Sequence, residues 1–324
     1  MGRYPEADLS KLRLISVRDR PTKVSVDDFA RPSADGREAE ALLARMPRQL
    51  GAEKLRETVA AIVQARVSGR PVVVLAGAHV VKVGVSPYLV AWMERGIVTH
   101  LALHGAGAIH DVEIALFGGT SEDVEEHLQQ GTFGLVRETG EFFFAAAAEA
   151  RERREGLGEA LGRKLEEARA PHADVSLLAA AWRAKIPATV HVALGTDTVH
   201  ALPMADGAAA GETTLRDFRI LAHTLGEARG ATVLNLGSAV VLPEVFLKAL
   251  TAAVNLGASL EGLTTVSLDQ IRHYRPRVNV LERPTRAPGA RGLELVGQHE
   301  IVLPLLGEAV LAAWSRIGTP IANL

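Results

Sequence analysis

The sequence predicts a doubly wound α/β domain, in which helices cover both faces of a parallel sheet. Five short segments are continuously apolar, which is typical of strands that are buried on both faces. Segments with helical spacing of their apolar residues alternate with these strands along the chain. A length of 324 residues allows one large domain with a substantial core.

Residues 1–50 are predicted to form an arm. Short apolar runs in this region are interrupted by prolines, at Pro5, Pro21, Pro32 and Pro47. Proline removes a backbone donor and disrupts regular elements, so this region is not expected to fold alone. The run at residues 12–17 is too apolar for a free tail. We therefore expect the arm to lie across the main body or across a partner subunit.

Residues 51–324 are predicted to form the single α/β domain. Its first helix runs from Glu53 to Val67, where apolar residues recur at three- and four-residue spacing before Gly69 and Pro71 end the pattern. The predicted strands are residues 72–76, 98–103, 188–193, 231–236 and 262–268. Further helices are predicted at residues 86–95, from about residue 111, and at residues 243–255.

Two segments interrupt this alternation. Residues 135–170 contain many Arg and Glu and little periodic apolar character, which predicts one or two solvated helices inserted on the sheet. Residues 272–300 are rich in Arg, Pro and Gly and are predicted to form a long loop.

The composition limits the classes of function. With 36 Lys+Arg against 38 Asp+Glu, the formal charge is -2, so no broad electrostatic attraction to nucleic acid or membrane is expected. No stretch approaches about 18 uninterrupted apolar residues, and the start of the chain has no apolar signal segment. We expect a cytoplasmic protein. The absence of cysteine excludes disulfides, thiolate zinc sites, iron–sulfur clusters and cysteine nucleophiles.

Ligands of open parallel sheets bind beyond the carboxyl ends of the strands, so the residues after each predicted strand are the candidates for a site. These segments are residues 77–84, 104–111, 194–200, 236–244 and 267–270. Three of them combine small residues with a following helix, which allows the backbone to approach a phosphate group. A simple turn remains the alternative for each one.

Histidines are concentrated in the same segments. Of the 11 histidines, five lie in or beside them, together with Asp111 and Asp197: His79, His104, His110, His191 and His200. Such imidazoles could act as acids or bases near neutral pH, or could cap helices and satisfy loop backbone. A histidine–carboxylate metal site is a weaker option, because no pair has the helical His-x-x-x-His spacing. We assign no metal ligand.

Charged side chains near the strand ends suggest a cationic substrate. The acidic candidates are Asp111, Glu113, Asp197, Glu244 and Asp269. Asp111 and Glu244 carry less weight, because carboxylates at helix N-termini also serve as caps. Lys82 and Lys248 could form a Schiff base if they were desolvated, but a solvated amine is the favoured interpretation for both.

These loops resemble those of the deoxyhypusine synthase family, which uses NAD to transfer an aminobutyl group from spermidine to a lysine. The resemblance extends in order over roughly residues 55–315 and rests on the segments 77–84, 98–119, 186–197, 235–241 and 299–306. It implies a Rossmann-like NAD-binding domain and a homotetramer with sites between subunits.

Departures from the family pattern bear on the activity. The family's acidic pair is replaced by His110-Asp111, and its Lys-His-His by Leu242-Pro243-Glu244. No lysine follows Lys248, so the family's imine-forming lysine is missing. Without that amine the family's covalent intermediate cannot form, and true deoxyhypusine synthesis is not expected.

We therefore expect an NAD-dependent transferase or oxidoreductase acting on a small amine or guanidine compound, such as a polyamine. Asp197, Glu244 and Asp269 would contact a cationic group, and His110 would move protons. The expected NAD contacts are Gly77, Ala78, His79, Gly105, Ala106, Gly107, Asp111, Gly237 and Ser238. Asp111 could alternatively orient His110.

Two alternatives of other classes stay open. One is a metal-assisted hydrolase built from the strand-end residues His104, His110, His191, His200 and Asp197. The other is a non-catalytic protein that binds a nucleotide but has lost the chemistry. Small molecules are the expected partners in every case, with no nucleic acid or membrane involved.

Overall fold

A six-stranded parallel sheet lies at the centre of the computed structural model, which describes residues 4–317. Its spatial order is β5-β3-β2-β6-β7-β8. The strands are β2 (Val72–Ala76), β3 (His100–His104), β5 (Ala188–His191), β6 (Thr232–Leu236), β7 (Thr264–Asp269) and β8 (Arg291–Val296). The α/β fold class is confirmed. The chain builds one half of the sheet outward from β2 and the other half outward from β6, so the switch point lies between these two strands.

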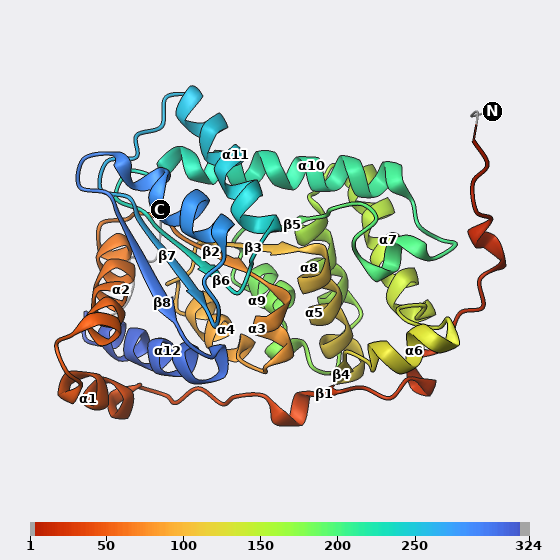
Figure 1. Cartoon of the computed structure of the whole chain (residues 1–324), viewed down its shortest axis with the longest axis horizontal. Coiled ribbons are helices and arrows are strands. Elements are labelled where there is room, and N and C mark those ends of the chain that lie inside the picture. The colour runs from red at the N-terminus through yellow and green to blue at the C-terminus, as the bar shows by residue number, and fades with distance from the viewer. Residues whose placement is uncertain (1–3, 318–324) are drawn as a thin grey trace.

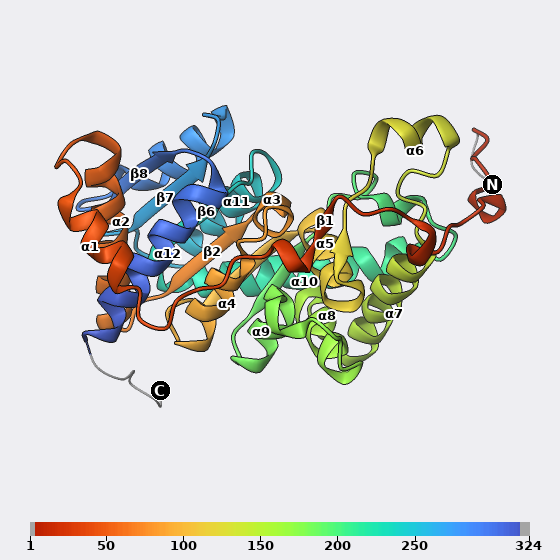
Figure 2. The ribbon, with the colours of Figure 1, turned by 90° about the horizontal axis from the view of Figure 1, so that it is seen from below.

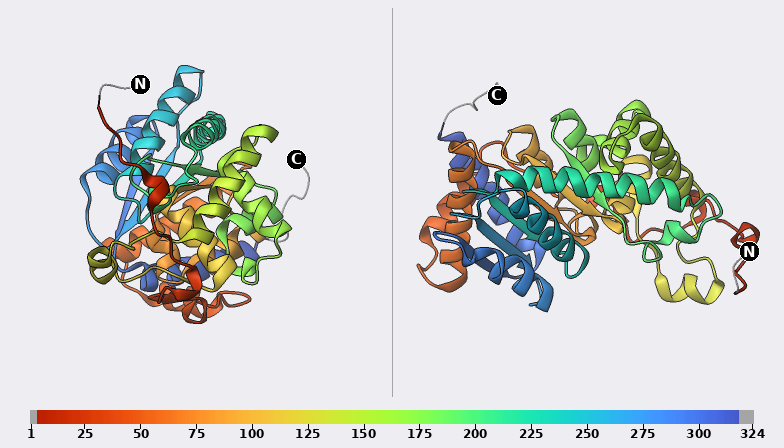
Figure 3. Two further views of the ribbon diagram at one scale, coloured as in Figure 1. Left: turned by 90° about the vertical axis from the view of Figure 1, so that its right-hand side faces the viewer. Right: turned by 90° about the horizontal axis from the view of Figure 1, so that it is seen from above.

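Helices cover both faces of this sheet, which explains why the strands are continuously apolar. Val72, Val74 and Ala76 pack on one face, and Val73 and Leu75 pack on the other. Figure 1 shows α10 (Gly207–Thr224) and α11 (Val241–Asn255) above the sheet. Below it lie α2 (Leu50–Val67), α4 (Ser86–Glu94), α5 (Gly105–Phe117), α9 (Leu177–Arg183) and α12 (His299–Ser315). Seen from above, α10 extends along much of the molecule beside α11 (Figure 3).

Residues 135–170 contain α7 (Arg137–Arg153) and α8 (Leu157–Glu167), but the expectation that they are solvated is wrong. Phe143, Phe144, Leu157, Leu161 and Leu165 are all buried. Small residues bring the helices close to their neighbours: a Cβ on Gly158 would lie 2.3 Å from the carbonyl oxygen of Ala188. Alanine and glycine contribute to this packing without producing a strong apolar period, and so the sequence pattern concealed it.

The region predicted as a long loop holds regular structure as well. It contains the π-helical turn η7 (Pro276–Glu282) and the sixth strand, β8. Only Leu293 and Leu295 of β8 are buried, whereas all four residues of β5, the strand at the other edge of the sheet, are buried. A strand that buries only alternate residues lacks the continuous apolar run by which the other five strands were found.

Two expected loops are helical from their first residues. α3 (Ala78–Lys82) follows β2 almost directly, and α5 starts at Gly105, immediately after β3, rather than near residue 111. His104 is the N-cap residue of α5. Residues 105–111, which were expected to form a loop that could approach a phosphate, therefore form the first two turns of α5.

The N-terminal region runs along the outside of its own chain, crossing over the helices of the lower face (Figure 2). Its strand β1 (Val24–Ser25) pairs with β4 (Gly119–Thr120), and Ile15 forms a bridge with Val136. Phe29 is buried against the core. The remaining helices are α1 (Arg37–Arg45), which lies within residues 1–50 and shows that part of the predicted arm is regular, and α6 (Val124–Gln130). Contact with a second subunit stays a prediction.

In the described part of the chain, residues 4–317, no helix has the length and apolar character needed to span a membrane.

Candidate active site

A cavity of about 220 Å³ lies at the carboxyl ends of β3 and β5. It brings together two of the four predicted catalytic residues, His110 on α5 and Asp197 in the loop after β5. Lys82 at the end of α3 also lines it, as does Arg20 from the N-terminal arm. A carboxylate, an imidazole and an amine from three separate segments thus face one space.

The carboxylate of Asp197 lies at the N-terminus of α5, where it accepts a hydrogen bond from the Ala106 N–H. Gly105 makes this approach possible, because a Cβ there would lie 2.0 Å from Oδ2 of Asp197. Burial raises the pKa of Asp197 to about 6, although the bonds from Ala106 and Thr196 lower it. The side chain is therefore mostly ionised at neutral pH.

His200 holds the loop that carries Asp197. Its Nδ1 accepts the backbone N–H groups of Gly195 and Asp197, each at 3.2 Å. Asp197 in turn is the N-cap of the short helix η5 (Thr198–Ala201). The imidazole of His200 therefore positions the loop rather than contributing to the cavity.

His104 and His191 also have structural partners. Nε2 of His104 accepts the N–H of Ala78 at 3.2 Å, and its Nδ1 lies 3.4 Å from the Gly107 nitrogen, so the ring bridges the starts of α3 and α5. Nε2 of His191 lies 3.0 Å from the Thr189 hydroxyl, and burial lowers the pKa of His191 to about 3. Within residues 4–317 no group of three or more His, Asp or Glu side chains could hold a metal ion. The metal-assisted hydrolase is therefore not favoured.

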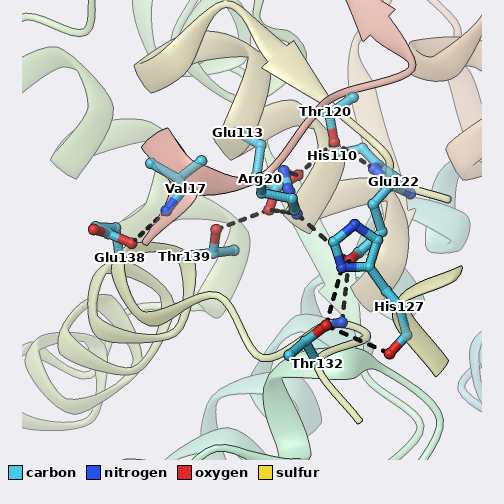
Figure 4. A network of polar contacts seen from close by, with 11 residues as sticks. Val17, Arg20, His110, Glu113, Thr120, Glu122, His127, Thr132, Glu138 and Thr139 are labelled. Atoms are coloured by element: carbon cyan, nitrogen blue, oxygen red, sulfur yellow. Dashed lines mark hydrogen bonds and ion pairs between the residues drawn. The ribbon is translucent and has the colours of Figure 1, made fainter. Parts of the chain in front are cut away.

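His110 is the one strand-end histidine that both lines the cavity and bonds to a side chain beside it. Its Nδ1 lies 2.7 Å from the hydroxyl of Thr120 (Figure 4). Burial lowers the pKa of His110 to about 4, Glu113 acts in the opposite direction, and Lys82 lowers it further. The ring is consequently neutral at pH 7.

Asp111 neither orients His110 nor lines the cavity. Its buried carboxylate accepts the Ser176 hydroxyl at 2.6 Å and the N–H groups of Leu177 and Leu178 at 2.7 and 3.0 Å. These bonds anchor the N-terminus of α9. We therefore remove Asp111 from the proposed site.

Glu244 and Asp269 lie apart from the cavity. Glu244 pairs with Lys248 and Arg275 and accepts a bond from Asn279, so nearby cations already neutralise it. Asp269 accepts the Gln270 N–H at 2.8 Å at the end of β7. Neither residue lines the space that holds His110 and Asp197, and both are left out of the site proposed below.

The predicted cofactor residues fall into two groups. Gly105, Ala106 and Gly107 form the first turn of α5, whose N-terminus already holds the carboxylate of Asp197. Gly77 and Gly237, in contrast, meet at the switch point, where a Cβ on Gly77 would lie 2.2 Å from the Gly237 carbonyl oxygen.

The switch point has features of a ligand site that α5 lacks. Ser238 follows Gly237, and its hydroxyl accepts the N–H of Leu242 at 3.3 Å in the first turn of α11, whose N-cap residue Val240 provides no side-chain cap. His79 packs edge-on against the buried His299, with ring centroids 5.2 Å apart. At the switch point two buried acceptors have no hydrogen-bond partner among the described residues, Oδ1 of Asn235 and Nδ1 of His299. The N–H groups at the start of a helix suit a phosphate, and unpaired acceptors suit an amide or amino donor of a nucleotide.

Sequence reasoning missed Arg20, Thr120 and His299. Arg20 lies 93 residues from its partner Glu113, so no local spacing could relate them. The only available signal was Glu113 itself, an acidic residue within the apolar helix α5, which implied a buried cation from elsewhere.

No protein-family model matches this sequence, and no curated protein matches it. Solved structures do share the fold. AgrE in a ternary complex with ornithine and NAD+ matches with a TM-score of 0.52 and 18% identity, over 89% of this chain and 35% of that chain. Unliganded AgrE matches with a TM-score of 0.53 and 17% identity, over 89% of this chain and 34% of that chain. This chain thus spans about a third of the length of AgrE.

A candidate deoxyhypusine synthase from Entamoeba histolytica matches with a TM-score of 0.49 and 10% identity, over 80% of this chain and 87% of that chain. That likeness is too weak to test the resemblance seen in the sequence. With all these identities below 20%, the comparisons establish a shared fold with AgrE and nothing finer.

Proposed function

We propose that the protein binds NAD and acts on a small amine or guanidine compound, by dehydrogenation or by transfer. The observation that carries this proposal is the cavity in which Asp197 and His110 meet. An ionised carboxylate suits an ammonium or guanidinium group, and a neutral imidazole suits the proton that must leave such a group.

Each residue has a distinct part in the proposed reaction. Asp197 holds the cationic nitrogen and orients it, fixed from behind by α5 and by His200. His110 takes the proton released from that nitrogen, and Glu113 stabilises the resulting imidazolium, since it raises the pKa of His110. NAD, when bound, would supply the hydride acceptor.

We place NAD at Gly77, Ala78, His79, Gly237 and Ser238. Support comes from the start of α11 beside Gly237, where Val240 provides no side-chain cap, and from the unpaired acceptors of Asn235 and His299. This is a narrower set than the sequence predicted, because Gly105 and Ala106 contact Asp197, the Gly107 N–H faces His104, and Asp111 anchors α9. One structure of AgrE, which shares the fold, holds both ornithine and NAD+, and this supports the class of ligand without deciding it.

Deoxyhypusine synthesis is not part of the proposal. No lysine follows Lys248, and Lys248 is paired with Glu244. Lys82 is the one lysine that lines the cavity.

Calorimetry with NAD, NADH and NADP at millimolar concentrations tests the cofactor, and turnover across a panel of amines and guanidines tests the chemistry. We expect heat with at least one nucleotide and NADH formation with at least one compound. No heat and no thermal shift would refute NAD binding. Tight binding without turnover would instead favour the non-catalytic alternative.

A further inference from the structure

A chain of buried hydrogen bonds connects His110 with the N-terminal arm (Figure 4). Nδ1 of His110 lies 2.7 Å from the hydroxyl oxygen of Thr120, and this hydroxyl lies 2.5 Å from Oε2 of Glu113. Arg20 contacts both oxygens of Glu113, at 3.0 and 2.9 Å. The side chains of Arg20 and Glu113 are only 4% and 3% exposed.

The charge of Glu113 sets the direction of these bonds. A carboxylate held by both arms of a buried guanidinium is ionised, so it can only accept. Thr120 must therefore donate its single hydroxyl proton to Glu113. Its oxygen can then only accept from His110, which requires a proton on Nδ1 of His110.

The remaining oxygen lone pairs of Glu113 are occupied as well. Thr139 donates to Oε1 at 2.8 Å, so the carboxylate accepts two bonds from Arg20 and one from each threonine. Nε2 of His110, at the other end of the chain of bonds, has no hydrogen-bond partner among residues 4–317, and His110 lines the cavity.

We propose that Arg20, Glu113 and Thr120 are positioning residues that hold His110 as its Nδ1–H tautomer and so present an unprotonated Nε2 to the cavity. The use of Nε2 as a proton acceptor rests on the proposed function, whereas the tautomer does not. The arm thus completes the active site, because it supplies the cation that keeps Glu113 ionised without protonating His110.

The charged and titratable groups around His110 fit this role for Arg20. Glu113 on the same helix raises the pKa of His110, while Lys82 on α3, Arg20 on the arm and His104 on β3 lower it. Burial is the largest effect and also lowers it. Without Arg20, the charge of Glu113 would be unopposed beside the ring, and the protonated form of His110 would gain.

The test is nitrogen-15 NMR of the histidine rings in the full-length protein at pH 7, with the His110 signals identified by their loss in His110→Gln. We expect a neutral ring with a pyrrole-type Nδ1 and a pyridine-type Nε2. Thr120→Val, nearly isosteric, should convert it to a mixture of tautomers, and Thr120→Ser should restore the single one. Thr224→Val is the matched control, because Thr224 pairs with the ring of His100 at 2.8 Å, at the amino end of β3.

A ring of His110 that is protonated at pH 7, or neutral with its proton on Nε2, would overturn the inference. So would a Thr120→Val protein in which the single Nδ1–H tautomer persists. If Thr120→Val fails to fold, the unaltered protein and Thr120→Ser still decide the matter. A wrong tautomer in a protein that binds NAD refutes this inference alone, and the expected tautomer without NAD binding refutes the cofactor alone.

Discussion

Two regions at the carboxyl edge of the sheet differ in how their polar groups are partnered. Beside β3 and β5, charged side chains are held mainly by the chain itself, with Asp197 on α5 and Arg20 on Glu113, although Nε of Arg20 and Oε2 of Glu122 lack hydrogen-bond partners. Between β2 and β6, the hydroxyl of Ser238 accepts the Leu242 N–H at the start of α11, and acceptors of Asn235 and His299 are buried without partners. A charged cavity suits a cationic substrate, and unpartnered side-chain acceptors beside a helix start suit a cofactor.

The largest effect on stability should come from replacing Arg20, the buried cation of the charged region. Arg20→Met leaves Glu113 buried without a cation, so we expect the free energy of unfolding to fall by about 3–5 kcal/mol. Arg18→Met is the matched control two residues away. Because Arg18 is exposed, its replacement should change the stability by less than about 0.5 kcal/mol. Urea denaturation measures both, and equal losses would show that the buried pair has no special importance.

Deletion of residues 1–30 extends the same test to assembly. The arm lies on its own chain, so the deletion should lower stability at least as much as Arg20→Met does. We also predict a homotetramer whose interface the arm helps to hold. Light scattering of the intact protein checks the assembly, and a clean monomer would refute this prediction.

Asp197→Asn should separate activity from folding. Removing one charge from a buried ion pair costs about 2–5 kcal/mol, so kcat/KM should fall about 30-fold or more. The melting temperature should change little, because Asn can still accept the Ala106 N–H. Asp174→Asn, on an exposed residue, is the control. A large loss of stability with normal turnover per folded molecule would reassign Asp197 to a structural role.

The switch point can be tested by placing a charge at the start of α11, where Val240 provides no side-chain cap. Val240→Asp places a carboxylate at the start of α11, where it should repel a pyrophosphate and occupy helix N–H groups. We expect the Kd for NAD to rise about tenfold. Val254→Asp, at an exposed position near the other end of α11, should leave the Kd unchanged. If both variants bind NAD normally, the cofactor does not use α11.

Protonation of Asp197 gives a pH test of the charged cavity. Because burial raises the pKa of Asp197 to about 6, its charge is mostly present at pH 7 and mostly lost at pH 5. L-arginine keeps its guanidinium charge over this range, so its affinity should fall by about tenfold from pH 7 to pH 5. His110, whose pKa is about 4, stays largely neutral throughout. Calorimetry at both pH values measures the affinity for L-arginine. If the affinity of Asp197→Asn falls by the same factor, a group other than Asp197 is responsible.

The parts of this fold that could be predicted are those governed by local patterns. The other five strands of the sheet were found because their burial makes them continuously apolar, and β8 was missed because only Leu293 and Leu295 of its residues are buried. The start of α5 was missed because Gly105 and Gly107 suggested a loop. Gly105 is small for a reason that the sequence hides, since the carboxylate of Asp197 occupies the place of a Cβ.

The site was only half predictable for a similar reason. Asp111 and Asp197 both lie in segments that follow a strand, yet Asp111, in the second turn of α5, anchors α9 while Asp197 lines the cavity. Nothing in their local sequence distinguishes them, because the difference depends on which helix packs against each carboxylate. The contribution of Arg20 was still less predictable, since its partner lies 93 residues away.

The smallest effect is expected at Lys82, and it concerns whether the charged cavity does covalent chemistry. Lys82 lines the cavity but is exposed, whereas a lysine that forms a Schiff base is usually desolvated. We therefore expect borohydride to trap no substrate-derived adduct during turnover, and Lys82→Gln to change kcat by only a few-fold. Peptide mass spectrometry after reduction is the measurement, with Lys248→Gln as the control on a lysine already paired with Glu244. An adduct on Lys82 would contradict this expectation. It would also mean that Lys82, at the end of α3, supplies the amine that the sequence lacks after Lys248.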